Sequence, residues 1–354
     1  MKGTRSVESA IPRQLRIERT RPRRIADDYV PPYPGFVARH DPAVTRVVMA
    51  YFGLQYPGEA TPEVHHDAAA ALQRIEAAFA AADSPGHWDR ASYVDEAGFT
   101  NIISIAYWDA PVRFDAWFAV HGRDWTADSR AGERVGYFSE VLRPAVDRYE
   151  TLFSSVDRPE GVAVLAGCMS DTVQEHAYWG AARDRIPLSQ TDALASAGAP
   201  RVVAEGARRR VLPQANLCLI RSGQDWGDTE ADERRMYEQD VEPVLRAGMD
   251  FLRDEGLAIG CYANRYMRVL GAGGAPLDKS FGMSWWTSLR ALERWSESHP
   301  THVAIFGAAM KYLQALGPAA RLKLYHEVTV AAADEQFFEY LNCHDRSGML
   351  RAGR

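Results

Sequence analysis

The sequence lacks the cysteine patterns that would assign it to a simple class. Its 354 residues include only four cysteines, and no two of them form a C-x-x-C pair. A zinc knuckle, a redox dithiol and a covalently attached c-type haem are therefore not indicated. We expect Cys168, Cys218, Cys261 and Cys343 to be reduced thiols in the core.

Long apolar runs and an excess of positive charge are also absent. No segment approaches the roughly 20 apolar residues that cross a bilayer, and no apolar stretch follows the charges near the N-terminus. The net charge of −6 gives the chain no overall attraction to nucleic acid or to anionic membranes. We therefore expect a cytoplasmic protein that binds neither.

The chain does contain enough apolar material for a large core, since 46% of its residues are hydrophobic. Residues 1–40 are rich in arginine and include Val30-Pro31-Pro32-Tyr33-Pro34-Gly35, which is incompatible with a helix or a central strand. We interpret 1–40 as an N-terminal arm that lies on the body or on a partner subunit, although a solvated tail can have the same composition. Residues 41–354 are expected to form a single domain.

That domain contains two parts with the same order of elements. Strand patterns occupy residues 46–56 and 99–108 in the first part, and 215–222, 258–270 and 280–286 in the second. A helix pattern lies between strands at 68–82 and again up to Gly256, and Pro111 opens a further short helix. In the second part, Thr229 and Asp232 have the spacing of a capping box, and Pro243 predicts a kink.

A spacing of tryptophans and histidines supports a duplication. The pattern Trp-x8-Trp-x3-His occurs twice, as Trp108, Trp117 and His121 and as Trp286, Trp295 and His299. We infer two related halves, about 41–160 and 161–340, of the ferredoxin-like α+β type. Such halves would build a barrel-type sheet with helices on the outside, beside which a flat cofactor could bind.

Two histidines are candidates for chemistry. His326 lies on a predicted strand, residues 322–330, and shares its face with apolar side chains. His302 ends the run Ser298-His299-Pro300-Thr301-His302, in which His299 is explained by the end of a helix. Either His302 or His326 can also be read as an ordinary core histidine.

Two further segments carry polar side chains. Residues 175–185 combine aromatic side chains with His176, Arg183 and Arg185, a composition that also fits a surface helix whose arginines pair with acids. Ser222 precedes a glycine at the end of a predicted strand, where a serine commonly begins a turn.

Taken together, five segments resemble the haem-containing aldoxime dehydratases. They are Tyr178-Trp179-Gly180, Arg221-Ser222-Gly223-Gln224-Asp225-Trp226, Gly248-Met249-Asp250-Phe251-Leu252-Arg253, residues 293–302 with Glu293-Arg294-Trp295 and Ser298-His299-Pro300-Thr301-His302, and Leu324-Tyr325-His326-Glu327-Val328. The resemblance extends from about Tyr29 to Arg351 and is weakest in the arm before Asp27. It implies a dimeric α+β barrel, a homodimer, and the conversion of an aldoxime, R–CH=N–OH, into a nitrile.

The same resemblance assigns a cofactor and its contacts. It implies a b-type haem, active in the ferrous form, whose iron is bound by His302 as the proximal ligand, while His299 is structural. His176 is a weaker candidate for the same pocket.

The resemblance also assigns catalytic roles. It implies that His326 is the acid and base, that Ser222 bonds to the oxime hydroxyl, and that Arg185 and Glu150 complete the acid/base group. Two other functions are compatible with the residues alone: a peroxidase or chlorite-decomposing enzyme with the same fold, and a haem-binding protein without turnover.

Overall fold

The protein is described by a computed structural model that covers residues 8–353. The first seven residues of the predicted arm lie outside the described residues. The helices are α1 (Pro62–Phe79), α2 (Pro111–Trp117), α3 (Arg123–Trp125), α4 (Ala181–Arg185), α5 (Ala231–Met236), α6 (Glu242–Glu255), α7 (Leu289–Ser298) and α8 (Pro300–Leu316). The strands are β1 (Ala38–Arg39), β2 (Val48–Pro57), β3 (His87–Val94), β4 (Phe99–Trp108), β5 (Gly136–Leu142), β6 (Tyr149–Phe153), β7 (Cys168–Met169), β8 (Arg201–Glu205), β9 (Arg208–Leu212), β10 (Leu217–Asp225), β11 (Cys261–Leu270), β12 (Pro276–Trp286), β13 (Lys323–Ala331) and β14 (Gln336–Leu341).

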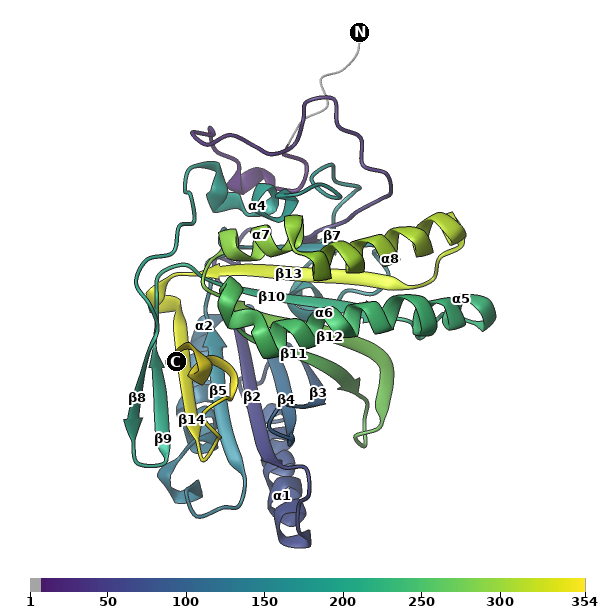
Figure 1. The fold of residues 1–354 in the computed structure, drawn as a ribbon. Coiled ribbons are helices and arrows are strands. Elements are labelled where there is room, and N and C mark those ends of the chain that lie inside the picture. The colour runs from purple at the N-terminus through teal and green to yellow at the C-terminus, as the bar shows by residue number, and fades with distance from the viewer. Residues whose placement is uncertain (1–7, 354) are drawn as a thin grey trace.

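The strands form one curled sheet of 12 strands, and a second small sheet pairs β1 with β7. The order in the large sheet is β6-β13-β10-β12-β11-β3-β4-β2-β5-β14-β9-β8. Neighbouring strands are antiparallel throughout the sheet, which curls into a half-barrel, and α6, α7 and α8 lie outside the strands β10 to β13 (Figure 1). The predicted α+β class with helices outside a curled sheet is confirmed.

Two stretches of the chain have the same connectivity. In both, the order along the chain is strand, helix, strand, strand, helix, strand, from β2 to β5 and from β10 to β13. The first strand of each stretch lies between the third and the fourth, and β3 and β11 join the two stretches edge to edge. The repeated tryptophans also occupy matching places, because the ring centroids of Trp108 and Trp117 lie 5.2 Å apart and those of Trp286 and Trp295 lie 5.6 Å apart.

The strand and helix patterns agree with the structure except near some ends. The helix predicted from residue 68 begins earlier, at Pro62, because a proline is well suited to the first helical position. Pro243, where the sequence predicts a kink, lies in the first turn of α6, shortly after a π-helical turn, Tyr237–Val241. The predicted capping box is wrong, since the Thr229 hydroxyl donates to the carbonyl of Trp226 and α5 starts only at Ala231.

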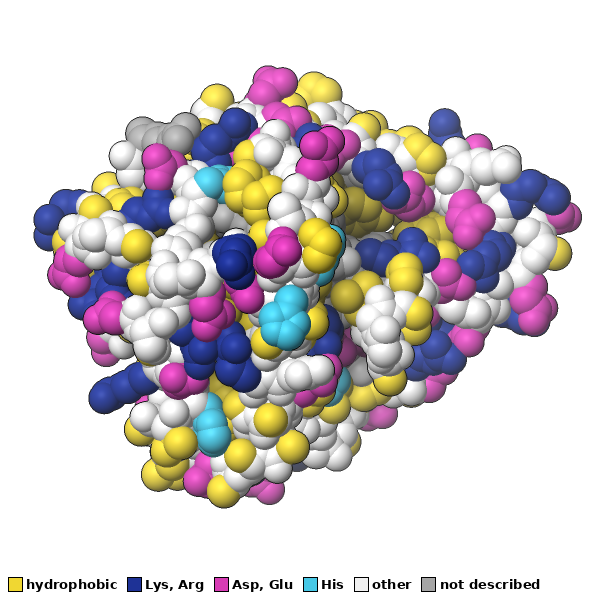
Figure 2. All heavy atoms as spheres, turned by 90° about the horizontal axis from the view of Figure 1, so that it is seen from below, with side chains coloured by type: hydrophobic (Ala, Val, Ile, Leu, Met, Phe, Trp, Pro, Cys, Tyr) yellow, Lys and Arg dark blue, Asp and Glu magenta, His cyan; other side chains and the backbone are white. Residues whose placement is uncertain are grey.

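The arm has little regular structure before β1, apart from the 3-10 turn Arg13–Leu15. It runs over the segment that carries α4 (Figure 1) and hydrogen-bonds to it at Glu175, Asp184 and Gln190. On the face seen from below, Lys and Arg side chains are interspersed with Asp and Glu (Figure 2). No helix within residues 8–353 has the length and hydrophobicity needed to cross a membrane.

Candidate active site

The outward face of two neighbouring strands carries the first two candidate residues. Ser222 on β10 and His326 on β13 are direct partners in the antiparallel register. Because side chains alternate along a strand, both point to the same face, whereas Arg221 and Glu327 point to the other face. Ser222 lies inside β10, which continues to Asp225, and not at the end of a strand as its sequence context predicted. Its hydroxyl makes no hydrogen bond with the described residues and is available to a ligand.

Three of the predicted catalytic side chains meet at one point. Nη2 of Arg185 lies 2.7 Å from Nε2 of His326, and Nε of Arg185 donates to Oε2 of Glu150 at 2.6 Å. Oε1 of Glu150 lies 3.2 Å from the same His326 nitrogen. Arg185 extends from the end of α4, whereas Glu150 lies on the edge strand β6, which pairs with β13. The contacts therefore bring together residues that are far apart in the sequence.

Arg185, Glu150 and His326 differ in how deeply their side chains are buried. The side chains of Arg185 and Glu150 are almost completely buried, whereas that of His326 is 26% exposed. Burial alone would raise the pKa of Glu150, but the positive charge of Arg185, the charge of His326 and hydrogen bonds from both outweigh it, so the pKa is lowered. Glu150 is thus ionised beside Arg185, and their charges compensate each other within the core.

The second predicted histidine, His302, lies on a different element. The residue between α7 and α8 is His299, whose ring caps the start of α8 by accepting from the backbone of Thr301. Pro300 therefore begins a new helix immediately, and His302 lies in its first turn. The ring of His302 packs edge-on against Trp295, with centroids 4.6 Å apart, and against Trp179 at 5.8 Å.

The environment of His302 suits a metal ligand. Burial lowers its pKa to about 4, with partial opposition from the backbone of Ser296, so the imidazole is neutral at pH 7. Its Nδ1 atom is buried without a hydrogen-bond partner of good geometry among the described residues. A neutral imidazole is the form that binds iron.

Helix α8 provides apolar surface beside His302. Its sequence is almost entirely apolar, yet Tyr312 is its one fully buried residue among those described. The helix packs on α6 and α7 more than on the sheet, Val303 and Phe306 are exposed, and a side chain at Gly307 would meet no atom within 4 Å. Uncovered apolar surface next to a neutral histidine fits a haem, which is flat, apolar and bound through one axial imidazole.

His176 lies beneath the N-terminal arm. It is completely buried, and its ring packs against Tyr33 of the arm at a centroid distance of 5.3 Å. A side chain at Gly35 would meet the His176 ring at 2.8 Å, so the arm passes directly over it. Burial and the nearby charge of Arg185 lower the pKa of His176 to about 4. His176 therefore contacts the arm, and its place in the haem pocket stays a prediction.

The family model for haem-containing dehydratases matches residues 50–349. The chain belongs to this family. Membership makes the protein an enzyme of the lyase class and confirms that haem is its cofactor. It also confirms the resemblance seen in the sequence.

Relatives of this haem-containing dehydratase align over nearly the whole chain. An aliphatic aldoxime dehydratase from Pseudomonas chlororaphis is 42% identical over 351 residues, which cover 98% of both chains. A phenylacetaldoxime dehydratase from Bacillus sp. (strain OxB-1) is 32% identical over 333 residues, or 92% of this chain and 93% of the relative.

Two solved structures show the same fold. A crystal structure of an aldoxime dehydratase superposes with a TM-score of 0.92 at 42% identity and covers 98% of each chain. An aldoxime dehydratase crystallised with butyraldoxime gives a TM-score of 0.92 at 40% identity and covers 99% of each chain.

In this family member, sequence reasoning missed the side chains that support the cluster. Glu175, directly before His176, and Asp184, within α4, are each 1% exposed and bind the arm. Their sequence context, two acids within a segment rich in aromatic side chains and arginine, suggested only surface ion pairs. Arg183 does form such a pair, with Glu293 at 2.7 Å, whereas Arg185 does not.

Proposed function

We propose that this protein dehydrates aldoximes to nitriles with a non-covalently bound haem b that is active in the ferrous state. The observation that carries this proposal is the contact of His326 with both Arg185 and Glu150, next to Ser222 on the same face of the sheet. The relatives named as aldoxime dehydratases, one of them crystallised with butyraldoxime, support the choice of substrate.

His302 would hold the haem iron. When bound, the haem would supply an electron-rich metal centre, whose chemistry weakens the N–O bond of an oxime. The neutral state of His302 and the apolar surface of α8 support this assignment.

His326 would then move the proton. Its Nε2 atom faces Arg185 and Glu150, and Nδ1 makes no hydrogen bond with the described residues, so Nδ1 is the atom left for the substrate. In the imidazolium form, Nδ1–H donates its proton to the oxime hydroxyl, the N–O bond breaks, and the hydroxyl leaves as water. The neutral ring then takes the proton from the oxime carbon as the C–N triple bond forms. No net proton or electron is consumed, and His326 returns to its starting state.

Arg185 and Glu150 would make both states of His326 accessible. Oε1 of Glu150, 3.2 Å from Nε2 of His326, can accept from Nε2–H. Nη2 of Arg185 can donate to the same nitrogen when it carries no proton. Because the two charges compensate each other, His326 can gain and lose a proton beside a pair with no net charge. Ser222 would orient the oxime hydroxyl toward His326.

The proposal extends to assembly and location. The same strand order in the stretches β2–β5 and β10–β13 supports a duplication of ferredoxin-like halves, about 41–160 and 161–340, within one domain that follows the arm. We propose that the protein is a cytoplasmic homodimer.

The test is to incubate dithionite-reduced, haem-loaded protein with butyraldoxime and with phenylacetaldoxime under anaerobic conditions and to quantify the nitrile. We expect nitrile formation that stops on exposure to air, and a loss of at least about 10²-fold in His326→Ala without loss of haem. A haem-loaded, reduced protein that makes no nitrile from either compound, but reacts with peroxide, would instead be a peroxidase.

A further inference from the structure

The N-terminal arm is anchored to the segment that presents Arg185. The buried carboxylate of Glu175 accepts hydrogen bonds from three successive backbone N–H groups of the arm, those of Glu8 at 2.6 Å, Ser9 at 2.8 Å and Ala10 at 3.0 Å. The hydroxyl of Ser9 donates to the same carboxylate at 2.5 Å. All the hydrogen bonds described for this carboxylate thus come from the arm.

A second set of contacts anchors the arm nearer to α4. Oδ2 of Asp184 accepts from the backbone of Arg24 at 2.8 Å and of Ile25 at 3.0 Å. The side chain of Gln190 accepts from the backbone of Ile17 at 3.0 Å. Since buried polar groups are costly without partners, the residues around Arg185 depend on the arm for a stable conformation.

Glu175 links these anchors directly to Arg185. While its carboxylate holds the arm, its backbone carbonyl accepts from Nη1 of Arg185 at 2.6 Å. Two residues on, Ala177 has a φ of +60°, which alanine rarely adopts. The hydroxyl of Tyr29 in the arm lies 2.9 Å from the carbonyls of both His176 and Ala177, between which its single proton is shared. The arm therefore stabilises a strained backbone that aims the Glu175 carbonyl at the guanidinium.

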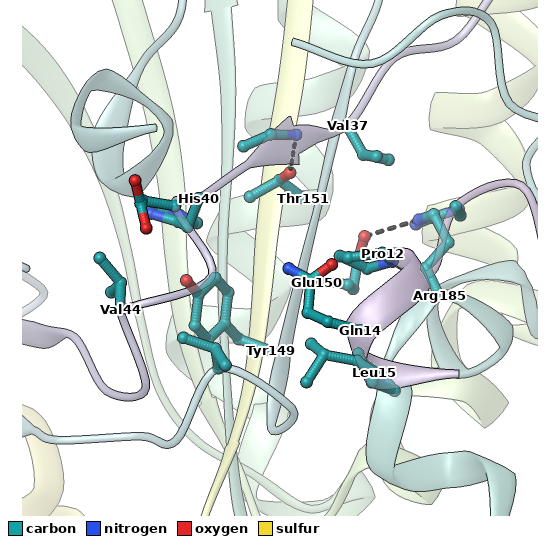
Figure 3. Close-up of a pocket in the computed structure, with 15 residues that line it drawn as sticks. Pro12, Gln14, Leu15, Val37, His40, Val44, Tyr149, Glu150, Thr151 and Arg185 are labelled. Carbon is teal, nitrogen blue, oxygen red and sulfur yellow. Dashed lines mark hydrogen bonds and ion pairs between the residues drawn. The ribbon is translucent and has the colours of Figure 1, made fainter. Parts of the chain in front are cut away.

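The arm also covers the Glu150–Arg185 pair. Between the arm and β6 lies a cavity of about 50 Å³ (Figure 3). Among the residues that face each other across it are Pro12, Gln14 and Leu15 from the arm and Tyr149, Glu150 and Arg185 from the body. Without the arm this wall would face bulk water, which weakens interactions between charges.

We propose that the arm is part of the catalytic apparatus. Residues 8–25, acting through Glu175 and Asp184, hold Arg185 so that Nε meets Glu150 and Nη2 meets His326. Glu175 and Asp184 are positioning residues. This inference rests on the proposed function, in which His326 is the catalytic acid and base.

The first test does not depend on turnover. In protein with 15N-labelled arginine, the Nε–H signal of Arg185, assigned by its loss in Arg185→Lys, is expected to be protected from exchange because it is bonded to buried Glu150. Glu175→Ala should shift this signal and speed its exchange at least about tenfold. The matched control is Asp95→Ala, since Asp95 is also buried and also accepts from loop backbone, at Ala97 and Phe99, but in the β3–β4 turn. It should leave the Arg185 signal unchanged.

The second test measures catalysis in the haem-loaded enzyme. Glu175→Ala should lower kcat by about 10–100-fold while KM and haem content stay within about twofold. Glu175→Gln, whose amide oxygen can still accept from the arm, should recover part of kcat. In an Arg185→Lys background, Glu175→Ala should lower kcat little further, since both substitutions act through the same contact.

Each outcome either supports or overturns the positioning role of the arm. An unchanged Arg185 signal in Glu175→Ala overturns the positioning role whatever the activity, and so does an equal effect of Asp95→Ala on that signal. If Glu175→Ala does not fold, Glu175→Gln and Ser9→Ala are measured in its place, and full protection of Arg185 in both has the same meaning. If the parent protein makes no nitrile but Glu175→Ala still shifts the Arg185 signal and speeds its exchange, the positioning role of the arm is supported and the proposed function is refuted.

Discussion

Replacing Glu150 by glutamine tests the electrostatics of the site most directly, because the change is nearly isosteric and removes only a charge. It leaves Arg185 buried without a counter-charge, and breaking a buried ion pair in this way costs about 3–5 kcal/mol. With an unfolding entropy of about 2.1 cal/mol/K per residue, that cost lowers Tm by about 4–7 °C for a chain of 354 residues. The guanidinium also loses the partner that holds it 2.7 Å from Nε2 of His326, so kcat should fall about 10²-fold or more.

The pH dependence of stability gives a sharper measurement. The pKa of Glu150 is lowered in the folded protein from its ordinary value of 4.5. Its ionised form therefore contributes stability that is fully present above about pH 4.5 and is lost as the pH falls through the lowered pKa. Differential scanning calorimetry from pH 7 downward should show the difference in Tm between parent and Glu150→Gln shrinking below that pH.

A control carboxylate is available on the surface. Glu76 pairs with Arg90 at 2.6 Å, but its side chain is 49% exposed, so Glu76→Gln should change Tm by little and leave kcat intact. The reasoning is refuted if Glu150→Gln is as stable and active as Glu76→Gln, or if its loss of Tm is the same at pH 7 and at pH 4.

Three further outcomes are expected. His302→Ala should purify with an intact circular dichroism spectrum but without the haem absorption band, and added imidazole should restore part of that band; full haem content in this variant would refute the ligand assignment. Ser222→Ala should lower kcat about 10–100-fold without changing Tm, since its hydroxyl has no partner among the described residues, and an equal loss of Tm would assign it a structural role instead. Removing haem should speed amide exchange in residues 300–316 much more than in α6, as measured by mass spectrometry, because α8 packs little against the sheet.

Local patterns predicted the elements well where a signal repeats along the chain. The strand at 99–108 agrees with β4 at both ends, and the alternation at 322–330 agrees with β13 to within one residue. Local patterns failed where a contact decided the end of an element. Thr229 has the spacing of a helix cap, but its hydroxyl bonds to the carbonyl of Trp226 within the preceding turn.

The sequence by itself determined which face of its strand His326 occupies and that a proline separates His299 from His302, because both follow from the spacing of neighbouring residues. Family resemblance, not spacing, pointed to Glu150 and Arg185. Only the tertiary structure decided that His326 pairs with Ser222, since the register of strands far apart in the chain depends on packing. It also decided that Arg183 turns to Glu293 while Arg185 turns inward, because the arm and β6 enclose one guanidinium and not the other.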